Sequence, residues 1–153
     1  MKELQIRRLK ENEIPPKSLL MLADPSPIMI NSYLHRGICF VAEKERETVG
    51  CYVLLETRPQ TVELVNIAVS EVDQGRGMGK KLVLHAIETA RSMGCRTIEI
   101  GTGNSSLAPL ALYQKCGFRI VGVEPDFFVH HYDEEIMENG IPCRDLIRLA
   151  KKL

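Results

Sequence analysis

The sequence predicts an α+β fold, with one mixed sheet that carries helices on both of its faces. Three observations support this class. Strand-like and helix-like runs alternate along the chain, residues 61–69 are almost all apolar, and apolar side chains repeat with helical spacing over 82–90. A strand that is apolar on both faces is usually covered by helices on both sides. A length of 153 residues suits one core, so residues 1–153 are expected to form a single domain.

The first part of the chain predicts a strand, two helices and a hairpin. Pro15-Pro16 can begin the first helix, because proline is tolerated in the first helical turn. Residues 24–27, which read Asp-Pro-Ser-Pro, interrupt the helical pattern before the second helix. Polar residues 43–47 then provide the turn of the hairpin. The expected elements are a strand over 4–9, helices over 18–23 and 28–34, and strands over 37–42 and 48–55.

The second part of the chain alternates strands with helices. Gly94 ends the helix that begins at Gly79, because glycine commonly follows the last helical turn. Pro109 lies near the start of the helix that carries Tyr113, and Gly117 ends that helix. A long polar excursion over 130–140 precedes the last strand. The expected strands cover residues 61–69, 97–101, 118–123 and 145–150.

Composition and charge exclude several classes of protein. Lys plus Arg and Asp plus Glu number 20 each, and only 5% of residues are aromatic, which argues against a nucleic-acid-binding protein. No apolar run approaches the roughly 20 residues that span a membrane, and the N-terminus lacks the apolar core of a signal peptide. The five widely spaced cysteines favour buried, reduced thiols. We therefore expect a cytoplasmic protein that binds neither membranes nor nucleic acids.

A glycine-rich segment, residues 74–80, joins the apolar strand 61–69 to an amphipathic helix. Such a turn leaves backbone N–H groups unpaired at the helix N-terminus. These donors and the positive end of the helix dipole form a site for phosphate oxygens. The segment therefore predicts a ligand or cofactor that carries phosphate groups.

Two familiar phosphate-binding motifs do not match residues 74–81. In a Walker loop, Gln74 would replace the first glycine and Lys81 the hydroxyl residue that holds magnesium. In a dinucleotide-binding motif that starts at Gly75, Lys80 would replace the third glycine. The remaining pattern is Gln-x-x-Gly-x-Gly, with Gln74, Gly77 and Gly79. It resembles the acetyl-CoA pyrophosphate loop of the GNAT superfamily of N-acetyltransferases.

A second motif strengthens this resemblance. The predicted strand 97–101 is followed by Asn104 and then by the run Ala111-Leu112-Tyr113-Gln114-Lys115-Cys116-Gly117-Phe118. An Asn followed by Ala-x-Tyr-x-Lys-x-Gly-Phe is similar to the second signature of the same superfamily, at the usual separation from the first. The resemblance implies a bacterial-type GNAT fold, with a twisted, mostly antiparallel sheet, and it is weakest before about residue 37 and after about residue 124.

The resemblance also implies how acetyl-CoA, the expected co-substrate, would be bound. Backbone N–H groups of the glycine-rich segment would hold the pyrophosphate. The main chain of Ile67, Ala68 and Val69 would pair with the pantetheine arm, and Asn104 would hydrogen-bond the cofactor. No metal is expected, and His130-His131 is interpreted as part of a solvated loop. The expected loop residues are Gln74, Gly75, Arg76, Gly77, Met78, Gly79 and Lys80.

Two side chains are candidates for catalysis. Tyr113 occupies the position at which the resemblance implies a general acid that protonates the departing CoA thiolate. Glu63 lies on the strand before the loop, where some family members carry a catalytic base; an ordered water is the alternative. Asn66 is unusual within an apolar strand, and it indicates either a bulge or a buried hydrogen-bonding role.

The acceptor region is less defined by the sequence. By analogy with the superfamily, Tyr52, Glu56, Phe127 and Phe128 are expected to line the acceptor site. Acidic residues such as Glu56, Glu63 and Asp126 hint at a cationic acceptor, either a small-molecule amine or a peptide amine. The last strand and the polar excursion before it are candidates for a homodimer interface.

The sequence therefore favours an enzyme that transfers acetyl from acetyl-CoA to a primary amine by direct attack. The alternative is a non-catalytic sensor or subunit with the same fold, which would bind CoA thioesters through an identical loop. A nucleotide-binding protein is a third possibility, which the mismatches at Lys80 and Lys81 weaken.

Overall fold

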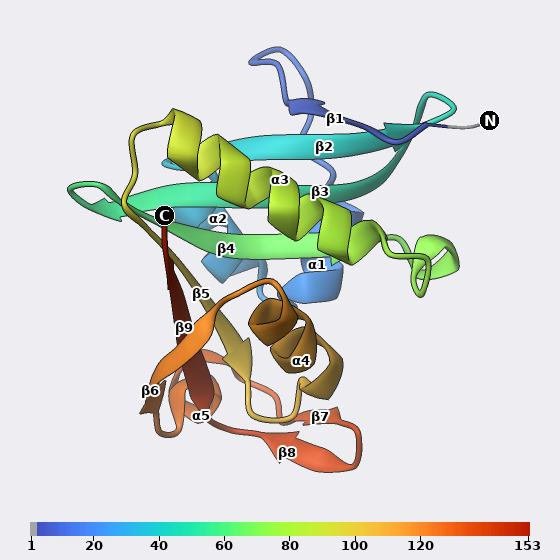
Figure 1. Ribbon diagram of the computed structural model, residues 1–153. Helices are drawn as coiled ribbons and strands as arrows, with labels where there is room; N and C mark the ends of the chain where they lie inside the picture. Colours follow the sequence, from blue (N-terminus) through green and yellow to red (C-terminus); the bar gives the residue numbers. More distant parts are fainter. Residues whose placement is uncertain (1–2) are drawn as a thin grey trace.

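The computed structural model describes residues 3–153 and contains a seven-stranded sheet and a separate two-stranded hairpin (Figure 1). The sheet order is β1-β2-β3-β4-β5-β9-β6, and every neighbouring pair is antiparallel except β4 and β5. The predicted mixed, mostly antiparallel sheet is confirmed. The strands are β1 (Gln5–Arg8), β2 (Ile38–Lys44), β3 (Glu47–Arg58), β4 (Thr61–Val69), β5 (Thr97–Gly103), β6 (Arg119–Glu124), β7 (Ile136–Glu138), β8 (Ile141–Cys143) and β9 (Leu146–Lys152).

Helices cover both faces of the sheet, as the sequence predicts. Figure 1 shows α3 across the near face of β2, β3 and β4, with α1 and α2 behind them. The larger buried cluster packs α3 and α4 against one face, and the smaller one packs α1 and α2 against the other. The helices are α1 (Lys17–Ala23), α2 (Pro27–Leu34), α3 (Met78–Ser92), α4 (Leu107–Lys115) and α5 (Phe127–His131), with a 3-10 turn over Glu71–Asp73.

Local signals explain where the helices begin and end. The Ser26 side chain accepts a hydrogen bond from the Met29 N–H at 3.2 Å, which caps α2. Gly94 follows α3 with a φ of +82°, a conformation that glycine adopts without strain. The apolar side of α3 is buried against the sheet through Leu82, Val83, Ala86, Ile87 and Ala90.

The strand β4 contributes side chains to both clusters. Val62 and Leu64 pack in the cluster with α3, whereas Ala68 packs in the cluster with α1 and α2. Residues at even positions of a regular strand all face the same side. An irregularity between Leu64 and Asn66 must therefore reverse the alternation, and it lies at Val65.

The polar excursion contains more structure than the sequence analysis expected. Residues 127–131 form α5, and β7 and β8 pair in a hairpin. The hairpin turn is Asn139-Gly140, in which both residues have positive φ, at 54° and 72°. Asn-Gly between two short runs that contain apolar residues is a strong hairpin signal, so this element was readable from the sequence and was missed. His130 and His131 lie exposed at the end of α5 rather than in a loop.

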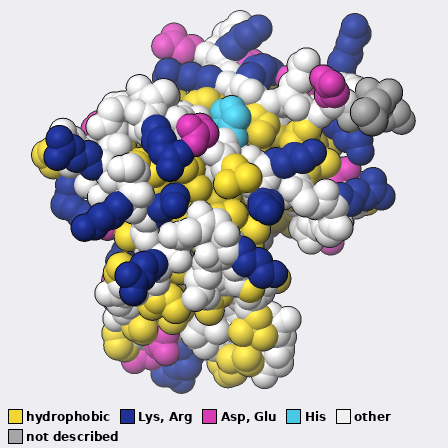
Figure 2. Space-filling view, viewed as in Figure 1, with side chains coloured by type: hydrophobic (Ala, Val, Ile, Leu, Met, Phe, Trp, Pro, Cys, Tyr) yellow, Lys and Arg dark blue, Asp and Glu magenta, His cyan; other side chains and the backbone are white. Residues whose placement is uncertain are grey.

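The surface gives two further findings. Figure 2 shows Lys and Arg side chains scattered over the face that carries α3, rather than gathered in one stripe. Within residues 3–153, no helix has the length and apolarity needed to cross a membrane.

Candidate active site

The candidate site begins where β4 separates from β5. β4 pairs with β3 from Thr61 to Val69, but with β5 only from Thr61 to Leu64. Val65 has no partner residue on β3, so a β-bulge lies at the point of separation. Beyond Leu64, the edge of β4 that faces β5 has no strand partner. A ligand with amide groups can pair with this edge as another strand would.

The glycine-rich segment follows directly after the free edge of β4. Gly75 and Gly77 have φ values of +78° and +81°, which side chains rarely adopt. Within residues 3–153, the N–H groups from Gly75 to Lys80 donate no backbone hydrogen bond, and no side chain caps α3. The Gln74 side chain donates to the Val69 carbonyl at 3.0 Å and so ties the segment to the end of β4. This arrangement is suited to bind phosphate oxygens.

A cavity of about 760 Å³ connects the free edge of β4 with the glycine-rich segment. Its lining includes most of the predicted site residues: Glu63, Ile67, Ala68, Val69, Gln74, Gly75, Gly77, Met78, Gly79, Lys80 and Tyr113. Arg76 and Asn104 are not in this lining. The structure therefore brings the glycine-rich segment together with Tyr113, which lies 33 residues after Lys80 in the sequence.

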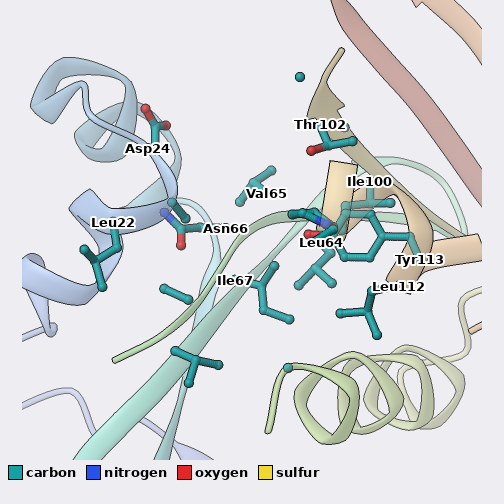
Figure 3. A pocket seen from close by; sticks show the side chains of 18 of the residues that line it. Leu22, Asp24, Leu64, Val65, Asn66, Ile67, Ile100, Thr102, Leu112 and Tyr113 are labelled. Carbon is teal, nitrogen blue, oxygen red and sulfur yellow. The ribbon is translucent and has the colours of Figure 1, made fainter. Parts of the chain in front are cut away.

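Tyr113 lies on α4, and its side chain is only 6% exposed. Figure 3 shows its ring beside Leu64 and Ile100, at the point where β4 and β5 separate. Burial raises the pKa of the Tyr113 hydroxyl above its ordinary value. The hydroxyl therefore stays protonated at neutral pH and has a proton to donate.

Glu63 is half-buried on β4 and lines the same cavity. Burial raises the pKa of its carboxyl group, Glu99 raises it further, and Arg148 and Arg58 lower it. The net result is a pKa above the ordinary glutamate value. A carboxylate of this kind binds a proton more readily than an exposed one, which suits a general base.

Asn104 is placed differently from the other predicted cofactor residues. Its side-chain oxygen accepts from the backbone N–H groups of Arg144 and Asp145, at 2.8 and 3.0 Å. Its nitrogen donates to the Pro142 carbonyl at 3.1 Å. The amide thus anchors the chain that follows the β7–β8 hairpin, and its role toward the cofactor stays a prediction.

Two of the four residues that were expected to line the acceptor site do not line the cavity. Phe127 and Phe128 line the cavity, but Tyr52 and Glu56 do not. The Tyr52 hydroxyl instead bonds His85 Nδ1 at 2.7 Å and Thr89 Oγ1 at 3.0 Å, beneath α3. A single sequence does not show which face of β3 a tyrosine occupies when both faces are covered.

A polar cluster at the other end of the cavity was missed by the sequence analysis. It consists of Asp24 after α1, Tyr33 on α2, Asn66 on β4 and Tyr132 after α5. The carboxyl group of Asp24 accepts from Tyr33 at 3.1 Å and from Tyr132 at 2.8 Å. Asn66 donates to the Tyr33 hydroxyl at 2.9 Å and to the Leu20 carbonyl at 3.0 Å. Both expectations for Asn66 hold, because it hydrogen-bonds and lies next to the bulge.

All five cysteines are buried and unpaired, as the sequence analysis expected. Burial raises the pKa of the Cys39 thiol to about 11 and that of Cys51 to about 12. Thiols with such pKa values carry little thiolate at neutral pH and react slowly.

Comparison with known proteins gives the family of this chain. A model of the acetyltransferase (GNAT) family matches residues 7–118, which is well over half of the chain. The chain therefore belongs to the GNAT acetyltransferase family, and the predicted class of enzyme is confirmed.

Three similar proteins cover nearly the whole chain. "Uncharacterized N-acetyltransferase YvbK" of Bacillus subtilis (strain 168) is 57% identical, over 97% of this chain and 96% of its own length. A solved structure of a Bacillus subtilis acetyltransferase in complex with CoA is 56% identical, covers 99% of both chains and has a TM-score of 0.93. A GNAT family acetyltransferase from Elizabethkingia anophelis with acetyl-CoA bound is 42% identical, covers 98% of both chains and has a TM-score of 0.96.

Proposed function

We propose that this protein transfers the acetyl group of acetyl-CoA to a primary amine by direct attack of the amine on the thioester. Acetyl-CoA is the co-substrate, because relatives 56% and 42% identical to this chain bind CoA and acetyl-CoA. One observation supports the proposal above all. The unpaired edge of β4 leads straight into unpaired N–H groups at the start of α3, and both line one cavity.

The cofactor residues act through their main chain. The N–H groups from Gly75 to Lys80 hold the pyrophosphate, and the edge of Ile67, Ala68 and Val69 pairs with the pantetheine amides. One N–H group of this edge also stabilises negative charge on the thioester oxygen. No side chain of these residues needs to touch the cofactor, although Lys80 adds positive charge near the phosphates.

Tyr113 and Glu63 handle the protons of the reaction. The amine nitrogen forms a bond to the carbonyl carbon as the carbon–sulfur bond breaks. Glu63 takes the proton that the amine loses, directly or through a water, and Tyr113 gives its hydroxyl proton to the departing sulfur. Binding both reactants in one cavity supplies the proximity that direct attack requires.

Acetyl-CoA binding and transfer can be tested separately. Calorimetry with acetyl-CoA, with ATP and NAD as controls, tests the loop assignment. Thiol release from acetyl-CoA across a panel of primary amines then tests transfer. Selective binding with thiol release supports the proposal. Selective binding with no thiol release for any amine would instead indicate a non-catalytic CoA-binding protein, and tighter binding of ATP or NAD would contradict the loop assignment.

We also propose a cytoplasmic location and a homodimer. Five free thiols favour a reducing compartment. The last strand cannot be the dimer edge, because β9 is paired on both sides. The edge strand of this region is β6, on which Ile120, Val121 and Val123 are all at least half exposed. Light scattering that detects only a 17.3 kDa particle would contradict the dimer.

A further inference from the structure

The polar cluster at the acceptor end of the cavity contains a carboxyl group with no cationic partner. Asp24 is only 8% exposed and accepts from two tyrosine hydroxyls and from the Ser26 N–H at 3.2 Å. Both carboxyl oxygens therefore accept hydrogen bonds, Oδ1 from Tyr132 and Ser26 and Oδ2 from Tyr33. Among residues 3–153, no Lys, Arg or His forms an ion pair with it. A buried carboxyl group with no cationic partner in the described part of the chain is a candidate partner for a cationic ligand.

Asn66, which belongs to the same polar cluster, supplies an independent observation. Its side chain is 3% exposed, and its Oδ1 is the one buried side-chain oxygen or nitrogen without a hydrogen-bond partner in the described part of the chain. The amide cannot be reversed, because the Leu20 carbonyl can only accept and therefore requires the Asn66 nitrogen. An N–H donor from a ligand would satisfy this oxygen.

Outside the glycine-rich segment, the charged side chains that line the cavity are all acidic. Among residues 3–153, the acidic residues in its lining are Asp24, Glu63, Asp73 and Glu138, and the only basic one is Lys80. Lys80 belongs to the segment that receives the pyrophosphate. The remaining wall therefore favours a ligand that is positively charged.

Building on the proposed acetyl transfer, we propose that Asp24, Tyr33, Asn66 and Tyr132 bind a second, unreactive ammonium group of a diamine acceptor. The reacting amine must be neutral to attack, whereas a buried carboxylate favours the protonated form of any amine it binds. The ammonium held by Asp24 is therefore not the nucleophile. Figure 3 shows Asp24 and Tyr113 on opposite sides of the cavity that both residues line.

Binding measurements test this subsite without the reaction. Calorimetry with putrescine, a short diamine, is compared with butylamine, which has the same length and a single amine. We expect putrescine to bind the wild-type protein, and Asp24→Asn to bind it about 10- to 100-fold more weakly, because a charge-assisted hydrogen bond contributes about 1.5–3 kcal/mol. The sequence suggested Asp126 as an acidic residue near the acceptor, but it lies outside the cavity lining and pairs with Arg144, so Asp126→Asn is the matched control.

Kinetics with acetyl-CoA give the second readout. Putrescine should have a higher kcat/KM than butylamine, and Asp24→Asn should remove the difference without changing acetyl-CoA affinity. Equal binding of putrescine and butylamine to the wild-type protein would overturn the subsite, even if the variant failed to fold. Undiminished putrescine binding by Asp24→Asn would overturn it too. Thiol release to butylamine would then still support the proposed transfer, whereas no release with any amine would contradict the transfer itself.

Discussion

The two ends of the cavity are built from different parts of the polypeptide. The cofactor end consists of main-chain groups on one continuous stretch, from the free edge of β4 to the first turn of α3. The opposite end, which we propose binds the acceptor, consists of side chains from four separate segments, and its hydrogen bond between Asp24 and Tyr132 joins residues 108 positions apart. A main-chain site depends on conformation and tolerates most side-chain changes. A side-chain site can be altered one residue at a time while the fold stays constant.

The largest expected effect is at Tyr113, which lies on α4 and lines the cavity. Tyr113→Phe should lower kcat by about 100-fold or more, because general acid catalysis typically contributes that much. Acetyl-CoA affinity should stay nearly constant. Tyr52→Phe is the matched control, since it removes the same hydroxyl from a tyrosine outside the cavity lining. Unchanged turnover in Tyr113→Phe would refute the general-acid role.

The second effect concerns the pH dependence of transfer. Glu63 accepts a proton only when ionised, so kcat/KM should fall as the pH is lowered through its raised pKa. In Glu63→Gln this acidic limb should disappear, and the rate at neutral pH should fall by about 10-fold or more. Glu99→Gln should move the limb to lower pH, because Glu99 raises the pKa of Glu63. An unchanged profile in Glu63→Gln would favour an ordered water as the base.

The third effect concerns Asn104, which can stabilise the fold, bind the cofactor or do both. Its amide makes one hydrogen bond to Pro142 in β8 and two to the residues directly after it, Arg144 and Asp145. Asn104→Ala should therefore lower the free energy of unfolding by about 1–3 kcal/mol, measured by urea denaturation. Calorimetry on the same variant then tests the cofactor role. A loss of acetyl-CoA affinity in the folded variant would support it, and an unchanged affinity would exclude it.

The smallest expected effect is on acetyl-CoA affinity, for a change in backbone conformation compared with the loss of a side chain in the glycine-rich segment. Gly77→Ala should weaken acetyl-CoA binding by about 10-fold, because a left-handed conformation costs a residue with a Cβ about 1–2 kcal/mol. Arg76→Ala should change the affinity little, since the Arg76 side chain is exposed outside the cavity lining. The reverse ranking in calorimetry would mean that side-chain charge, rather than the backbone, binds the pyrophosphate.

The contrast between one continuous stretch and several separate segments also explains which parts of the site the sequence could predict. The bounds of β4 and the start of α3 were predicted closely, because a continuous motif of 20 residues or so carries its own conformational signals. The polar cluster could not be predicted, because nothing in the sequence near Asp24 or near Tyr132 indicates that these two residues contact each other. Tyr52 was placed wrongly for a related reason, because β3 is covered on both faces.

The bulge at Val65 has a consequence for how the cavity could be lost. Without this residue, Leu64 and Asn66 would be consecutive, and the register shift opposite Val53 and Leu54 of β3 would disappear, leaving only the one between Glu56 and Arg58. A single-codon deletion there would not remove a functional group, yet it would turn the side chains of one half of β4 to the opposite face. The geometry of the site therefore depends partly on the number of residues in β4. Substitutions keep that number constant, so a substitution scan of β4 would not detect this dependence.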